Sequence, residues 1–100
     1  MTKLPYLLEW RPAALEDLRA IVRHIAKDNP TRARSFAQEL RSKAELLQQH
    51  PLLGRTGRPA LPAWLRELIA HHNYLILYRV HDKTRTIEVL RVKHAAQQLP

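Results

Sequence analysis

An apolar run follows two histidines in the stretch HHNYLILYRV, which occupies residues 71–80. Aliphatic and aromatic residues fill the segment YLILYRV at residues 74–80, and this composition favours a β-strand. Apolar residues lie at both odd and even positions, so both faces of the strand would be apolar. We therefore expect residues 74–80 to form the central strand of a sheet.

Two further strands are predicted next to this one, WLRELIA at residues 64–70 and TIEVLRV at residues 86–92. The segments between the three strands, HHN and HDKTR, are short enough for antiparallel hairpins. A short edge strand, YLLEW at residues 6–10, is expected to end before Pro12. The sequence thus predicts an N-terminal edge strand and, later in the chain, a three-stranded antiparallel meander.

Two amphipathic helices are predicted between the first strand and the meander. Pro12 suits the first turn of one helix, and the segment KDNP at residues 27–30 ends it. Pro30 begins the second helix in the same way. Apolar residues recur at helical spacing in both, at Leu15, Leu18, Val22 and Ile25, and then at Ala33, Phe36, Ala37, Leu40, Ala44 and Leu47. We expect a helical hairpin that packs on the sheet, a single α+β domain over residues 1–100, and a short C-terminal tail.

Basic residues dominate the charge of the chain. Lysines and arginines number 17 and acidic residues number 9, which gives a net charge of +8. Such a charge attracts polyanions or an acidic protein partner. The chain has no cysteine, which excludes disulfides, a thiol nucleophile and a thiolate metal site. We expect a cytoplasmic protein without a membrane segment, because neither a signal peptide nor a run of 18 apolar residues is found.

The pairing of residues 74–80 with residues 86–92 would leave one face of the sheet for the helices and another for a partner. In the expected register, Leu77 lies near Val89 and Leu75 near Arg91. The helix-facing set would be Tyr74, Ile76, Tyr78, Val80, Leu90 and Val92. The opposite face would hold Leu75, Leu77, Arg79, Ile87, Val89, Arg91 and Lys93. That face either forms a groove, with Arg55 and Arg58 nearby, or is covered by the tail or by the loop at residues 50–62.

The chain resembles the RelE/ParE superfamily of bacterial toxins, and within it the ParE branch. The segments that carry the resemblance are HPLLGRTGR, HHNYLILYRV and RVKHAAQQLP, in this order from His50 to Pro100, after a helical hairpin with DNP at its turn. The resemblance covers almost the whole chain.

This resemblance implies the toxin of a type II toxin–antitoxin system. It also implies a small acidic antitoxin, a higher-order toxin–antitoxin complex and, for ParE-like members, DNA gyrase as the target. An alternative is a RelE-like endonuclease that cuts mRNA on the ribosome, and a milder one is a non-toxic relative that retains antitoxin binding. No cofactor is expected in any of these cases.

One position separates the two branches. The resemblance implies that RelE-like nucleases place an arginine two residues after the residue that opens the central strand. Asn73 opens the strand here and Leu75 stands at the matching position, where a leucine cannot bind a phosphate. A tyrosine expected after the last strand is also missing, since Lys93 and His94 are followed by two alanines. We therefore favour a toxin that acts by binding over an enzyme.

Histidines keep an enzymatic alternative open. His71, His72 and His94 lie at neighbouring strand ends in the expected topology, and imidazoles serve as acids and bases near neutral pH. With Arg91, they are the catalytic candidates of the nuclease alternative. The simpler interpretation makes His71 and His72 exposed hairpin residues and Glu67 a charge partner of Arg66. No metal site is expected, because no carboxylate or thiolate lies at ligand spacing.

The contact residues that we predict for the target or the antitoxin come from the loop, the central strand and the last strand. They are Arg55, Arg58, Leu75, Leu77, Arg79, Arg91, Lys93 and His94.

Overall fold

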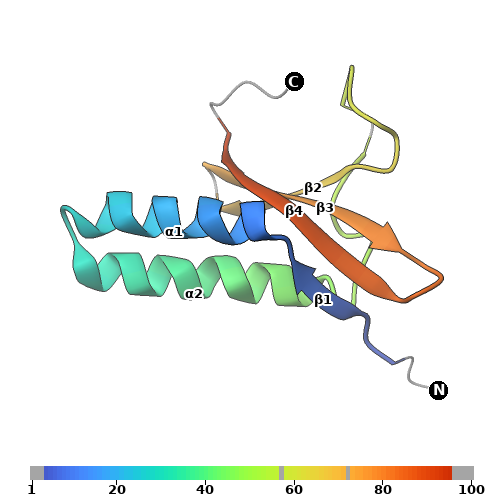
Figure 1. Cartoon of the computed structure of the whole chain (residues 1–100), viewed down its shortest axis with the longest axis horizontal. Helices are drawn as coiled ribbons and strands as arrows, with labels where there is room; N and C mark the ends of the chain where they lie inside the picture. Colours follow the sequence, from blue (N-terminus) through green and yellow to red (C-terminus); the bar gives the residue numbers. More distant parts are fainter. Residues whose placement is uncertain (1–3, 57, 72, 96–100) are drawn as a thin grey trace.

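The computed structural model describes residues 4–56, 58–71 and 73–95. Within these residues the elements are, in chain order, β1 (Leu7–Trp10), α1 (Pro12–Ala26), α2 (Pro30–Leu46), β2 (Arg66–His71), β3 (Tyr74–His81) and β4 (Thr86–His94). Figure 1 shows the two helices side by side below one sheet, and the loop between α2 and β2 rising on the opposite side of that sheet. The predicted α+β fold is confirmed.

The four strands of this sheet follow the order β1-β4-β3-β2. β2, β3 and β4 form the antiparallel meander that the sequence predicts. β1 is an edge strand and runs parallel to β4, from the pair Leu7–Thr86 to the pair Trp10–Val89. Because β1 ends at Trp10 and α1 starts at Pro12, the rest of β4 continues past the end of its neighbour.

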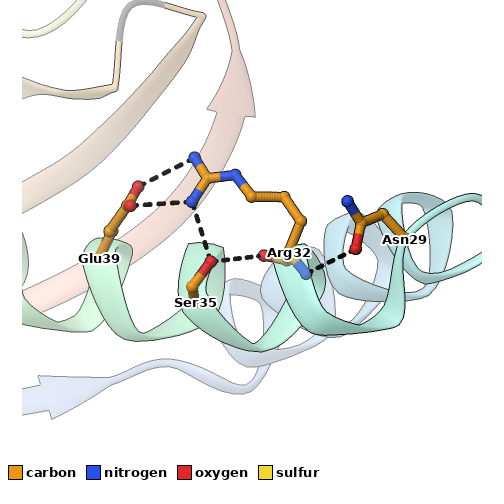
Figure 2. Close-up of polar contacts among 4 residues, drawn as sticks. All are labelled: Asn29, Arg32, Ser35 and Glu39. Carbon is orange, nitrogen blue, oxygen red and sulfur yellow. Dashed lines mark hydrogen bonds and ion pairs between the residues drawn. The ribbon is translucent and has the colours of Figure 1, made fainter.

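Proline and asparagine define where α2 begins. Pro30 is in the first turn, and the Asn29 side chain accepts a hydrogen bond of 3.0 Å from the Arg32 backbone N–H. The Arg32 guanidinium donates to the Glu39 carboxylate, at 2.8 and 3.2 Å, and to the Ser35 hydroxyl at 3.0 Å (Figure 2). This network lies on the solvent side of the helix and joins its first three turns.

The hydrophobic core lies between the helical hairpin and the sheet. The helices contribute Ala14, Leu18, Phe36, Leu40 and Ala44, Leu47 joins them directly after α2, and the sheet contributes Leu68, Ala70, Ile76, Tyr78, Ile87, Val89 and Val92. Most of the predicted helical stripe is therefore buried, as expected from its spacing. In the described part of the chain, neither helix has the length and apolar character needed to cross a bilayer.

A β-bulge in β4 changes the register that the sequence predicts. Leu77 pairs with Arg91 and Leu75 with Lys93, whereas Tyr78 pairs with Val89, so that Leu90 is the extra residue. A bulge reverses the alternation of side chains along the strand. The expected register was therefore wrong by two residues at this end. Ile87 and Val89, which were expected on the opposite face, lie in the core instead of Leu90.

Candidate binding surface

We call the face of the sheet opposite the helices the outer face. Two leucines of β3 on this face are buried. Leu75 and Leu77 are each 6% exposed. In the register they lie between Glu67 and Ile69 of β2 and the basic side of β4. Leu75 and Leu77, which were expected to contact a partner directly, are therefore buried and lie beneath the exposed residues of this face.

Glu67 holds two arginines of the preceding loop on the outer face. Its carboxylate is 7% exposed and accepts hydrogen bonds from Arg58 Nε at 2.8 Å, Arg58 Nη2 at 3.0 Å and Arg55 Nε at 3.1 Å. Burial opposes ionisation, but these hydrogen bonds outweigh it and lower the pKa of Glu67. The predicted pair with Arg66 was wrong, because the Arg66 guanidinium donates instead to the Gly54 carbonyl at 2.7 Å.

Backbone and side-chain hydrogen bonds fasten this loop to the sheet. Arg55 and Glu67 exchange backbone hydrogen bonds of 3.0 and 2.9 Å. The buried Tyr78 hydroxyl donates to the Pro51 carbonyl and accepts from the Gly54 N–H, both at 2.8 Å. Burial raises the pKa of Tyr78, so its hydroxyl remains protonated in these bonds. These contacts anchor residues 51–55 of the loop to the sheet.

An arginine and a tryptophan stack on the same face. The Arg79 Cζ atom lies 4.5 Å from the centre of the Trp64 ring, a cation–π geometry. Trp64 is 46% exposed, and further along the face Ile69 is 55% exposed. We call this surface the outer-face patch and define it as Arg55, Arg58, Trp64, Ile69 and Arg79. Trp64 and Ile69 were not among the contacts predicted from the sequence, because Trp64 was placed in a strand, whereas β2 begins only at Arg66.

Arg91 is directed toward α1. Its guanidinium makes two hydrogen bonds to the Asp17 carboxylate, at 2.7 and 2.9 Å. Asp17 also accepts the Val92 backbone N–H at 3.0 Å, on the part of β4 beyond the end of β1. Burial opposes ionisation of Asp17, but the bonds from Arg91 and Val92 outweigh it and lower the pKa of this carboxyl group. Asp17 thus accepts a backbone hydrogen bond that a neighbouring strand would otherwise accept.

His71 and His94, two of the histidines of the nuclease alternative, lie on the helix-facing side of the sheet. His71 pairs with Tyr74, and Tyr74 pairs with His94, so two strand spacings, roughly 10 Å, separate the two histidines. Phe36 packs edge-on against both His71 and Tyr74, with ring centres 5.3 and 5.0 Å apart. His71 is half-buried, which corrects the simpler interpretation of an exposed hairpin residue. His72 lies outside the described residues.

A second surface is a groove between α1 and α2 with a volume of about 320 Å³. Its apolar part is formed by Leu15, Leu18, Val22 and Ala37, and its basic part by Arg19, Arg23 and Arg41. Leu15 and Ala37 belong to the predicted helical stripes, but they are half-buried at the edge of the core. Among the described residues, no three histidine, aspartate or glutamate side chains come together as a metal ion would require.

The carboxylates of Asp17 and Glu67, whose pKa values are lowered by their arginine partners, predict how the stability of the protein responds to acid. A carboxyl group whose folded pKa is lowered stabilises the fold above its unfolded pKa, and this stabilisation is lost as the pH falls through the folded pKa. We expect the free energy of unfolding to decline below about pH 4.5, close to the ordinary pKa of glutamate. Urea unfolding at a series of pH values measures this decline. The double variant Asp17→Asn/Glu67→Gln should show a shallower one, and an equally steep decline would contradict the assignment.

Comparison with known proteins matches nearly the whole chain. The family model described as the ParE toxin of the type II toxin–antitoxin system parDE matches residues 8–99. Toxin RelE2 of Caulobacter vibrioides is 35% identical over 88 residues, which are 88% of this chain and 93% of that protein. Putative toxin Y4kP of Sinorhizobium fredii is 32% identical over 93 residues, which are 93% and 92% of the two chains.

Two solved structures are similar over the same extent. A chain of the chromosomal ParDE toxin–antitoxin system from P. aeruginosa has a TM-score of 0.75 and 27% identity, covering 89% of this chain and 95% of that one. A chain of the toxin–antitoxin complex RelBE2 from Mycobacterium tuberculosis has a TM-score of 0.70 and 26% identity, covering 94% and 95%. The fold is therefore shared with a chain of a ParDE system and with a chain of a RelBE complex.

Proposed function

Since this chain belongs to the ParE toxin family of type II toxin–antitoxin systems, we propose that it arrests bacterial growth by binding DNA gyrase in the cytoplasm. The similarity to the relatives named RelE2 and Y4kP supports a toxin of the RelE/ParE superfamily, as the resemblance in the sequence predicts. The observation that carries the gyrase proposal is the outer-face patch, a rigid surface of arginines and a tryptophan. Tryptophan and arginine are the residues that most often dominate the affinity of protein interfaces.

The charge and construction of the outer-face patch suit a binding surface. Three arginines and Glu67 leave it with a net positive charge, and Glu67 fixes Arg55 and Arg58 in place before any partner arrives. Side chains that are already ordered lose less conformational entropy on binding. Arg79 is likewise restrained on the Trp64 ring. Of the contacts predicted from the sequence, we retain these three arginines, add Trp64 and Ile69, and treat Leu75 and Leu77 as their support.

A cognate antitoxin is the proposed second partner. The similar solved structures from P. aeruginosa and M. tuberculosis are toxin–antitoxin systems. We propose a small acidic antitoxin with an amphipathic helix that docks in the groove between α1 and α2, within a higher-order toxin–antitoxin complex. The apolar part of the groove suits the apolar face of such a helix, and Arg19, Arg23 and Arg41 suit its acidic residues.

An mRNA endonuclease remains the second candidate, because relatives of this chain carry the name RelE. Cleavage of RNA requires an acid, a base and cations around one phosphate. His71 and His94 instead lie two strands apart on the helix-facing side, and each is packed against an aromatic ring. Arg91 is paired with Asp17, and Leu75 is apolar and buried. This arrangement favours binding over cleavage.

Replacing His71, His72 and His94 together by alanine tests the chemistry directly. We expect expression of the unchanged chain to stop growth, coexpression with its proposed small acidic antitoxin to restore it, and the triple variant to remain toxic. Colony counts after induction measure all three. Loss of toxicity, with the triple variant still folded by circular dichroism, would favour the nuclease. Normal growth with the unchanged chain would point to a non-toxic relative.

Replacing Trp64 and Arg79 by alanine tests the outer-face patch. We expect this double variant to lose toxicity, because truncation of interface residues of this kind costs about 2 kcal/mol or more each. Arg34→Ala is the matched control, since Arg34 is an exposed arginine of α2 outside the patch. Thermal unfolding shows that each variant is folded. Full toxicity of the double variant would exclude the patch as the target surface.

A further inference from the structure

A cleft between α1 and the end of β4 is a second site with its own charges, separate from the outer-face patch. Its volume is about 250 Å³. β1 pairs with β4 only as far as Val89, so the following residues of β4 face α1 with no strand between them. Asp17 covers the first part of this edge by accepting the Val92 N–H. Ala20, on the next turn of α1, has too small a side chain to fill the space beyond.

The walls of the cleft carry polar and charged groups from three elements. α1 contributes Asp17 and, two turns later, His24. β4 contributes Lys93 and His94, and β3 contributes Tyr74, whose ring lies edge-on to His94 at 5.0 Å. They belong to three segments that are far apart in the sequence, at residues 17–24, 74 and 93–94.

The charge of the cleft is positive. Among the described residues of its wall the carboxylate is that of Asp17, and two hydrogen bonds from Arg91 neutralise it. The charge of Lys93 then remains in excess, and each imidazole offers an N–H donor when neutral and a positive charge when protonated. Lysine is a common point-charge ligand of phosphate, and N–H donors around it complete the binding of phosphate oxygens.

We propose that the cleft between α1 and β4 binds the phosphate group of a small ligand, through Lys93, His24 and His94. The volume accommodates a phosphate with an attached sugar-sized group, since it equals the space of about eight waters. The Tyr74 and His94 rings would lie next to that attached group. This inference goes beyond gyrase binding and does not depend on it, because Lys93, His24 and His94 are not part of the outer-face patch.

Titration of the full chain with inorganic phosphate and with adenosine 5′-monophosphate, at constant ionic strength, tests the site. We expect saturable shifts of the His24 and His94 imidazole signals in NMR spectra. Lys93→Gln should weaken binding by about tenfold or more, as for a lost charge-assisted hydrogen bond. Lys83→Gln, which removes the same charge from an exposed turn, should change it less than about twofold. His24→Gln and the exposed control His50→Gln provide a second matched pair.

The outcomes separate the possible ligands and the possible failures. Tighter binding of the nucleotide supports a phosphate ester as the ligand, whereas equal binding of both probes supports the phosphate group alone. Absence of saturable shifts would overturn the proposal. Equal weakening by Lys93→Gln and Lys83→Gln would also overturn it, because general surface charge would then explain the binding. Growth arrest by the same variants is scored separately, so failure of this site leaves the toxin proposal intact.

Discussion

Gly54→Ala is expected to lower the free energy of unfolding by about 2–4 kcal/mol. An added Cβ would lie 2.7 Å from the Cε1 and Oη atoms of Tyr78 and 2.9 Å from the Glu67 carbonyl oxygen. None of these atoms can move easily, because Tyr78 is fully buried and the carbonyl belongs to the backbone of β2. The loop would have to withdraw, which would break the hydrogen bond from the Gly54 N–H to Tyr78.

Urea and thermal unfolding measure this effect. For a domain of about this size, the melting temperature should fall by roughly 10 °C or more. Leu53→Ala is the control, because Leu53 is adjacent and half-exposed, and its change should stay within about 0.5 kcal/mol. We also expect Gly54→Ala to weaken target binding, since Arg55 follows directly. A variant as stable as the unchanged chain would show that the loop is not fastened through this contact.

Asp17→Ala is expected to lower the free energy of unfolding by about 2–3 kcal/mol. The carboxylate is largely buried and accepts three hydrogen bonds, two from Arg91 and one from the Val92 backbone. Alanine would leave that N–H without its partner at the edge of β4 and would release the Arg91 guanidinium. Burial of an unsatisfied backbone group is among the more costly defects in a fold.

Glu16→Ala is the matched control for Asp17→Ala. Glu16 is the preceding residue, and its carboxylate pairs with Arg19 and Arg23, all three mostly exposed. Exposed ion pairs contribute about 0–1 kcal/mol, so this variant should unfold almost as the unchanged chain does. Urea unfolding of both variants at neutral pH provides the comparison. Equal destabilisation would mean that Asp17 does not substitute for a strand, and that the loss of any helix carboxylate is sufficient.

The architecture could be predicted because its signals are local. The apolar run at residues 74–80 predicts an interior strand, and Pro12 and Pro30 correctly predict the starts of α1 and α2. The short connections between the last three strands predict the antiparallel meander. Hydrophobic periodicity then predicts which helical residues are buried, and Leu18, Phe36 and Leu40 are all in the core.

The details of the surface could not be predicted because they depend on residues distant in the chain. The bulge at Leu90 has no local signal, since no glycine or proline marks it, yet it decides the face of Ile87 and Val89. Arg91 is paired with a residue 74 positions earlier. Glu67 lies next to Arg66, but its carboxylate is bound by arginines 9 and 12 positions before it. The sequence therefore identified the arginines Arg55, Arg58 and Arg91 as candidates, but it did not identify the carboxylates that pair with them.

The most direct test of the central claim is a supercoiling assay with purified gyrase, relaxed plasmid and the purified toxin. Binding without chemistry predicts that the toxin stops supercoiling, that the Trp64→Ala/Arg79→Ala variant does not, and that mRNA stays intact in a ribosomal translation reaction with the same toxin. Normal supercoiling together with fragmented mRNA would contradict gyrase binding and would establish the endonuclease in its place.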